Sequence, residues 1–402
     1  MQIPLIETKI FDYELPNERI AKYPKENRNS SKLLIYKNRE ITETVFSEIH
    51  KHIPPDYLLV FNDTKVLPAR MFFHKQTGAL IEIFLLEPYE PKDYNINLNR
   101  IQSCDWVCFV GNAKKWKHHE ILVKTLNINN EDIYIKAIKI SSQQNTFIIH
   151  FEWTGSIPFL DILNQIGNIP IPPYLKRNTE AIDIERYQTV FSKYLGSVAA
   201  PTASLHFTKD EFNQFDQIGI NYTYLTLHVG AGTFKPMTSQ YIHEHELHTE
   251  FFEVYKNSLE KIAQFYPKII AVGTTSLRAL ESIYHAGNLL LNKENNFNFI
   301  PQWCEYDALN KHKALFAINN LIDYLSEYQL NKLDLHTQIM IAPHYQIKMA
   351  EGIITNFHQP QSSLLALVAG FVGDDWKQIY RYALSHDFRF LSYGDSSLLW
   401  RK

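Results

Sequence analysis

The stretch KIIAVGTTSLRALES, residues 268–282, joins a short apolar run to a polar loop and a helical period. Residues 269–272 are apolar and rich in β-branched side chains, which favours a buried strand. Thr274, Thr275 and Ser276 then offer an N-cap for a helix whose first-turn amides would face a ligand. The stretch therefore predicts a strand, a turn and a helix, as in an α/β fold.

Two other stretches repeat this pattern with different chemistry. EGIITNFH, residues 351–358, leads through a proline into SSLLALVAGF, residues 362–371, and YTYLTLHVGAGTF, residues 222–234, places Gly230 and Gly232 just after a strand. Glycines there leave room for backbone to approach a ligand, although an ordinary turn explains them equally well. Because ligands collect at the carboxyl ends of strands in open α/β sheets, we expect binding residues in these loops.

The region from Ala79 to Trp153 has a different character. It consists of short β-rich runs separated by turn or charged residues, namely ALIEIFLLE, DWVCFVG, EILVKTLNI, DIYIKAIKI and NTFIIHFEW. Such runs predict a small antiparallel barrel or sandwich. The flanking segments alternate strands with helical periods, so we predict an α/β catalytic domain, residues 1–75 and 154–402, with an inserted antiparallel β-barrel domain, residues 76–153.

Composition limits the class of protein. The chain has 402 residues, 45% hydrophobic and 21% charged, with a net charge of −3, which is typical of a soluble globular protein without a general attraction for nucleic acid. Residues 1–16 lack the apolar core of a signal peptide, and residues 364–372 are too few to cross a bilayer and predict a core helix. We therefore expect a cytoplasmic protein with three reduced, structural cysteines.

Several polar segments have two interpretations each. HEHELHTE places His243, His245 and His248 so that different pairs share a face in a strand and in a helix; a polar surface or substrate-facing segment is favoured over a metal site. GNAKKWKHHE interleaves basic residues with Trp116, and PPYLKRN sets Lys176 and Arg177 beside a tyrosine. Both suit contact with RNA, and both also suit a solvated surface.

GSVAAPTASLHF, residues 196–207, is a run of small residues around a proline, which makes a poor core and a poor regular element. It suggests close approach to a ligand that Thr202 and His206 would reach, or else a tight structural loop.

Taken together, the motifs resemble the S-adenosylmethionine:tRNA ribosyltransferase-isomerase family over nearly the whole chain. The resemblance rests on segments in family order: FDYELPNERIAKYP, FNDTKVLPAR, YQTVFSKYLGSVAAPTASLHF, LTLHVGAGTF, AVGTTSLRALES, ITNFHQPQSSLL and FRFLSYGDSSLL. It implies a two-domain monomer that joins the ribosyl group of S-adenosylmethionine to 7-aminomethyl-7-deazaguanine at the tRNA wobble position, giving epoxyqueuosine-tRNA, adenine and methionine. S-adenosylmethionine would be consumed as a substrate, with no resident cofactor or metal and no membrane partner.

The resemblance also implies roles for site residues. Proton transfer is expected of His206, His228 and His358. Thr233, Thr274, Thr275 and Arg278 would hold the methionine carboxylate or ribose hydroxyls, through a helix N-terminus and a bidentate fork. Asn62, Asp63 and Asn356 would bind base edges or orient a histidine, or else stabilise loops. Lys65, Ser204, His344, Glu351 and Gln361 depart from the family pattern.

Two alternatives remain open. One is an RNA methyltransferase that uses S-adenosylmethionine, although the usual glycine-rich loop after the first strand is missing. The other is a non-catalytic tRNA-binding protein.

Overall fold

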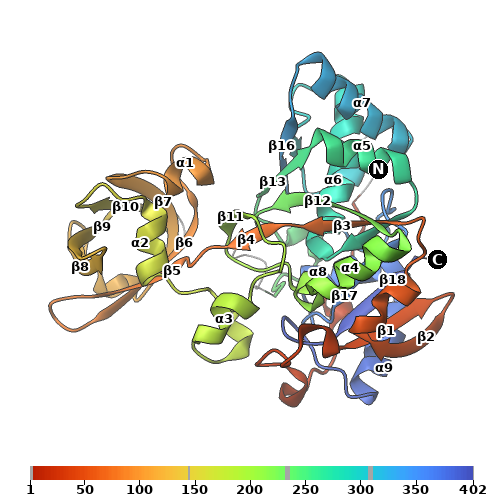
Figure 1. The fold of residues 1–402 in the computed structure, drawn as a ribbon, viewed down its shortest axis with the longest axis horizontal. Helices are drawn as coiled ribbons and strands as arrows, with labels where there is room; N and C mark the ends of the chain where they lie inside the picture. Colours follow the sequence, from red (N-terminus) through yellow and green to blue (C-terminus); the bar gives the residue numbers. More distant parts are fainter. Residues whose placement is uncertain (1–2, 144, 231–235, 307–310, 402) are drawn as a thin grey trace.

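The computed structural model describes residues 3–143, 145–230, 236–306 and 311–401. Its main feature is a ten-stranded mixed sheet (Figure 1). In spatial order its strands are β15 (Phe299–Ile300), β16 (Lys332–Thr337), β13 (Glu250–Tyr255), β12 (Asn221–Leu227), β3 (Leu58–Asn62), β14 (Ile269–Val272), β17 (Gly352–Asn356), β18 (Ser396–Trp400), β1 (Lys32–Lys37) and β2 (Glu40–Val45).

The centre of this sheet is parallel. β12 and β14 pair with β3 on either side, and β17 pairs with β14, all in parallel register. Two of the three predicted strand, turn and helix units are confirmed, because α6 (Thr274–Leu291) follows β14 and α8 (Ser363–Val372) follows β17. For β12 only the strand is confirmed: in the described residues after it a 3₁₀ turn (Ile242–Glu244) and β13 follow in place of a helix. Since parallel strands end at one edge, the loops that follow all three lie at the same edge of the sheet.

Both faces of the central strands are buried. Leu58 and Val60 of β3 belong to one hydrophobic core, and the alternating Leu59 and Phe61 belong to another. The first core takes side chains from α5 (Lys256–Phe265), α6 (Thr274–Leu291), α7 (Ala314–Glu327), α8 (Ser363–Val372) and α9 (Trp376–Ser385). The second core takes Phe215 from α4 (Lys209–Ile218). Burial on two faces explains the continuous apolar runs of these strands.

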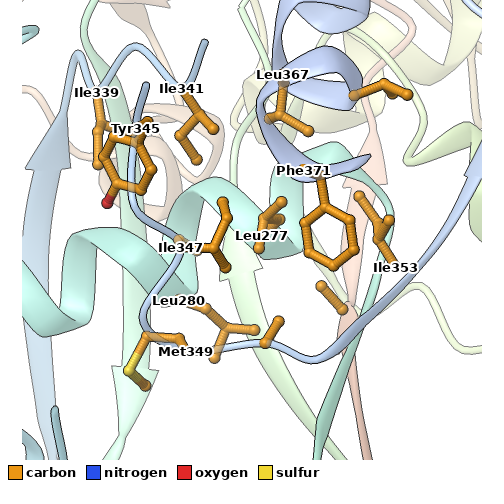
Figure 2. Close-up of a cluster of buried hydrophobic side chains, with 14 of the residues drawn as sticks. Leu277, Leu280, Ile339, Ile341, Tyr345, Ile347, Met349, Ile353, Leu367 and Phe371 are labelled. Carbon is orange, nitrogen blue, oxygen red and sulfur yellow. The ribbon is translucent and has the colours of Figure 1, made fainter. Parts of the chain in front are cut away.

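The first core fixes the helices that border the candidate site. Leu277 and Leu280 of α6 and Leu367 and Phe371 of α8 gather over Ile353 of β17 (Figure 2). The predicted core helix at residues 364–372 is thereby confirmed as most of α8.

A second sheet has six strands, each antiparallel to its neighbours. In spatial order they are β5 (Arg70–His74), β6 (Leu80–Pro88), β7 (Ser103–Gly111), β10 (Thr146–Trp153), β9 (Glu131–Gln143) and β8 (Ile121–Ile128). The five predicted β runs are confirmed, whereas β5 was not predicted. The edge strands β5 and β8 lie close together without a ladder between them, so this part of the described chain forms a nearly closed, barrel-like sheet.

The two sheets are connected through short elements. β4 (Thr64–Val66) leaves the large sheet after β3 and pairs in parallel with β11 (Tyr194–Ser197), which precedes the return to β12 (Figure 1). α1 (Tyr94–Leu98) and α2 (Phe159–Ile166) pack on the six-stranded sheet, and the six-residue helix α3 (Ala181–Arg186) follows α2. The predicted domain boundary after residue 75 falls between β5 and β6.

The described residues also bear on the predictions about the cysteines and about membrane-spanning helices. Cys104, Cys108 and Cys304 are all buried, as expected of structural cysteines. No helix in the described ranges is both long and apolar enough to span a membrane.

Candidate active site

Five of the predicted site residues line one cavity of about 70 Å³, called here the first cavity. They are Thr202, Thr274, Thr275, Asn356 and His358. The wall is built from residues 199–203, the start of α6 and residues 355–359, so GSVAAPTASLHF and the ends of two sheet strands meet there. The small side chains of residues 199–203 therefore border a cavity, as close approach to a ligand requires.

The start of α6 gives this cavity its electrostatic character. Gly273 is the N-cap, with φ at 94°, and its N–H donates to Ile354 O at 2.8 Å. The predicted capping by Thr274, Thr275 or Ser276 is wrong: no side chain of the described residues caps the helix, and Ser276 Oγ donates back to Val272 O at 2.8 Å. The first-turn amides are left for another partner, and the positive end of the helix dipole favours an anionic group.

His358 faces the first cavity as a neutral base. Its Nε2 lies 2.9 Å from Thr355 Oγ1, whose hydroxyl donates to Asn356 O at 3.4 Å, so the ring donates from Nε2 and keeps a lone pair on Nδ1. Burial lowers the pKa of His358 to about 3. Among the described residues Nδ1 has no hydrogen-bond partner, and a buried imidazole with a free lone pair can accept a proton from a bound molecule.

His206 lies behind Asn356. Asn356 Nδ2 donates to Leu391 O at 2.9 Å, which directs its Oδ1 toward His206 Nε2 at 3.0 Å. His206 Nδ1 then accepts from Ser31 Oγ at 2.8 Å. Burial lowers the pKa of His206 to about 4, so the ring is neutral with both nitrogens engaged. This arrangement favours the orientation of Asn356 over proton transfer in the cavity.

His228 does not line the first cavity. Its Nδ1 lies 2.9 Å from Thr64 Oγ1, its ring centroid is 4.9 Å from that of Tyr94 in α1, and its other side rests on Gly196. Burial lowers the pKa of His228 to about 4. The ring therefore sits where β4, β11 and α1 meet.

Gly196 makes this position testable. A Cβ at residue 196 would lie 2.6 to 2.7 Å from three atoms of the His228 ring, so Gly196→Ala must displace the imidazole. We expect a loss of about 1–3 kcal/mol in the free energy of unfolding from overpacking, together with a shifted His228 imidazole resonance. Urea unfolding and NMR of the histidine side chains would check this, and an unmoved resonance would contradict the packing.

Asn62 and Asp63 do not line the first cavity, nor the second cavity described below. Asn62 is fully buried and exchanges hydrogen bonds with the backbone N–H and C=O of Leu227, at 3.0 and 2.9 Å, which ties β3 to β12. Asp63 accepts from Thr226 Oγ1 at 2.6 Å, and burial raises its pKa to about 6. For Asn62 the geometry matches the loop-stabilising alternative.

A second cavity, of about 220 Å³, adjoins the first through Leu364. It is lined by the predicted residues Gly230 and Arg278. Arg278 Nη1 forms an ion pair with Glu250, Nε donates to Ile339 O at 3.3 Å, and Nη2 is buried without a partner among the described residues. The cavity thus offers a carboxylate and a guanidinium to a polar ligand.

HEHELHTE borders the second cavity without being a strand or a helix. A short 3₁₀ turn (Ile242–Glu244) is followed by irregular chain up to β13, so neither predicted face pairing applies. His245 and His248 line the cavity, whereas His243 stacks on Tyr241. In the described ranges no three His, Cys, Asp or Glu side chains are grouped as a metal site requires.

Other sequence-based candidates fall elsewhere. Gly232 and Thr233 lie outside the described residues. Trp116 is 1% exposed and donates from Nε1 to Glu120 O, so its indole is not available for contact with RNA, while Lys114, Lys115 and Lys117 are exposed. Sequence reasoning missed the partners Ser31, Thr355 and Ser392, because serine and threonine give no signal until folding brings them beside a histidine or a cavity.

Comparisons with known proteins agree with these motifs. The family model described as queuosine biosynthesis protein matches residues 8–399. The chain is 37% identical over 400 residues to an S-adenosylmethionine:tRNA ribosyltransferase-isomerase from Legionella pneumophila (strain Lens), covering 97% of this chain and 98% of the relative. It is 34% identical over 396 residues to the protein of that name from Sulfurihydrogenibium sp. (strain YO3AOP1), with the same coverage of 97% and 98%.

A solved structure is also similar. The S-adenosylmethionine tRNA ribosyltransferase of Thermotoga maritima is 26% identical, with a TM-score of 0.45 and coverage of 97% of this chain and 99% of that one. On the family match and the full-length relatives, this chain belongs to the queuosine biosynthesis family of S-adenosylmethionine:tRNA ribosyltransferase-isomerases.

Proposed function

We propose that this protein transfers and isomerises the ribosyl group of S-adenosylmethionine onto 7-aminomethyl-7-deazaguanine at the tRNA wobble position. The products are epoxyqueuosine-tRNA, adenine and methionine. The observation that carries the proposal is that relatives named for this activity are 34% to 37% identical to this chain over 97% of its length.

The ribosyl transfer requires a general base, a site that binds an anionic group and a pocket that excludes water. The substrate brings its own amine nucleophile, so the enzyme needs no serine or cysteine nucleophile. We assign the acceptance of the acidified proton beside the sulfonium to His358 Nδ1, and the binding of the methionine carboxylate to the start of α6; both line the first cavity. The apolar part of the cavity wall would help to exclude water from reactive intermediates.

Two adjoining cavities suit two substrates. The first cavity offers the base and the helix N-terminus, and the second offers Glu250 and Arg278, whose charges can pair with polar groups of a purine-like base. Leu364 lines both cavities, which supports adjacent binding of the two substrates. Adjacent binding would hold both reactants in register, which is a large part of the rate enhancement available to bimolecular reactions.

The proposal extends to the domain bounds, the oligomeric state and the location of the protein. We infer an inserted β-barrel domain at residues 76–153, an α/β catalytic domain from residues 1–75 and 154–402, a monomeric state and a cytoplasmic location. S-adenosylmethionine would be consumed as a substrate without a resident cofactor. The chain position of the six-stranded sheet, between β4 and β11, supports the insertion.

Product analysis tests the activity. Purified protein incubated with S-adenosylmethionine and anticodon stem-loop RNA carrying the aminomethyl base is expected to release adenine in equal amount to the epoxyqueuosine formed. Nucleoside mass spectrometry and chromatography of adenine would measure both. S-adenosylhomocysteine with methylated RNA would instead establish a methyltransferase, and bound but unmodified RNA would establish a non-catalytic binder.

A further inference from the structure

Four cationic side chains surround a third, small cavity of about 20 Å³. Lys25 and Arg28 come from the N-terminal segment, Arg186 from the end of α3 and Arg389 from the segment before β18. These four residues, called here the cationic cluster, are separated by up to several hundred positions in the chain. Folding therefore concentrates positive charge at one point of a protein whose net charge is −3.

The three arginines bond to backbone rather than to acids. Arg28 donates to Gln188 O and Glu185 O at 2.7 and 2.8 Å, Arg186 to Glu26 O and Lys25 O at 3.0 and 2.6 Å, and Arg389 to Tyr393 O. No described carboxylate forms an ion pair with any of these three guanidinium groups, and Nε of Arg186 and of Arg389 is buried without a partner there. Carbonyl bonds orient the guanidinium groups, and nearby carboxylates compensate their charges only in part.

Two carboxylates of the described residues act on the cluster. Asp395 is 1% exposed and lies 3.7 Å from Lys25 Nζ, but its oxygens already accept from the backbone N–H of Lys32 at 2.9 Å and of Arg389 at 2.7 Å. Burial and the like charge of Arg186 lower the pKa of Arg28, and the negative charge of Glu185 only partly offsets them. These two acids face four cations. Desolvated positive charges of this kind are stabilised by a bound anion.

The cluster adjoins the candidate active site. Ser392 lines both the small cavity and the first cavity, and His206 lines the small cavity while bonding to Asn356 in the wall of the first. The small cavity has room for one water-sized group only. An anion that fits is therefore one oxygen of a larger group that remains outside.

We propose that the cationic cluster binds a phosphodiester of the tRNA anticodon loop, adjacent to the nucleotide whose base enters the active site. This rests on the proposed function, which supplies the RNA. Arginine forks match the two non-bridging oxygens of a phosphate. Because Ser392 lines both the small cavity and the first cavity, a phosphate held by the cluster would fix the register of the strand beside the reacting base. The methionine carboxylate of S-adenosylmethionine is the competing anion.

The test measures RNA binding and turnover separately. Arg28→Met, Arg186→Met and Lys25→Met are each compared with Arg381→Met, an exposed arginine on α9 outside the cluster. We expect the Kd for anticodon stem-loop RNA to rise about ten-fold or more for a cluster arginine and less for Lys25, with the slope of log Kd against log salt falling by about 0.7 per lost contact. The control variant and the KM for S-adenosylmethionine should stay unchanged.

A second variant and a modified RNA distinguish the loss of a phosphate contact from misfolding of the variant protein. Arg28→Lys keeps the charge without the fork and should therefore recover only part of the affinity lost in Arg28→Met. A methylphosphonate at one position of the loop should weaken wild-type binding without further weakening Arg28→Met. A raised KM for S-adenosylmethionine with unaltered RNA affinity would overturn the proposal in favour of the carboxylate. Unaltered RNA affinity in all cluster variants would overturn it outright. Wild-type protein that binds RNA through the cluster but forms no product would refute only the proposed activity.

Discussion

Replacing His358 with alanine is expected to lower kcat for epoxyqueuosine formation by a factor of about 10² to 10⁴, the contribution usual for a general base. The expectation follows from its position: His358 lines the first cavity, bonds to Thr355 through Nε2 and has Nδ1 free toward a bound molecule. Single-turnover adenine release at saturating RNA would measure the effect on the chemical step.

The control is His386→Ala, which removes an exposed histidine stacked on Tyr382 and should leave kcat unchanged. A pH profile adds an independent readout. Because burial lowers the pKa of His358 to about 3, the neutral base is present throughout pH 5 to 8, and this group should produce no acid limb in kcat/KM there. Full activity in His358→Ala would remove it from proton transfer and leave His228 as the histidine to test.

Asp183→Asn is expected to cost about 3–5 kcal/mol of unfolding free energy, because it leaves a buried charge without its partner. Arg177 and Asp183 form two hydrogen bonds of 2.7 Å, with side chains 8% and 0% exposed. Asp183 also accepts from Tyr393 Oη at 2.8 Å and from Glu180 N at 2.8 Å. Urea unfolding at pH 7 would measure the loss.

A solvent-exposed ion pair provides the matched control for the buried pair of Arg177 and Asp183. Lys51 and Glu48 form an ion pair at 2.6 Å with side chains 57% and 40% exposed, so Glu48→Gln should lower the free energy of unfolding far less than Asp183→Asn does. An equal loss in the two variants would contradict the role assigned to burial.

The sign of the pH effect follows from the pKa of Asp183. Burial acts to raise this pKa, but the hydrogen bonds from Arg177, Glu180 and Tyr393 outweigh it and hold the pKa below its ordinary value. The stabilisation is therefore complete above about pH 4, the ordinary range for an aspartate, and is lost as pH falls through the folded-state pKa. The difference between wild type and Asp183→Asn should shrink in that acidic range.

The sequence predicted the local units well. Residues 269–272 became β14 and residues 363–372 became α8, and the five β runs between residues 79 and 153 all became strands. β5 was missed, since RMFFH has no polar alternation and follows directly on FNDTKVLPA. The cap of α6 was also predicted wrongly, because the positive φ of Gly273 replaces a side-chain cap.

The candidate site was predicted in part. Thr202, Thr274, Thr275, Asn356 and His358 were expected from loops after strands, and parallel pairing brings them to one edge. Arg278 lies instead in the second cavity, in an ion pair with Glu250 that joins β13 to α6. The spacing of residues along the chain carries no information about such pairs.

The sequence by itself determined the strands β12, β14 and β17, the helices that follow β14 and β17, the edge where their loops meet and the family, because apolar periodicity, turn residues and motif order are local properties. Only the tertiary structure decided which histidine faces the cavity and which supports Asn356, and that the cationic cluster exists. Those outcomes depend on side-chain direction, burial and partners contributed by distant segments, and burial in turn sets the pKa of each buried histidine.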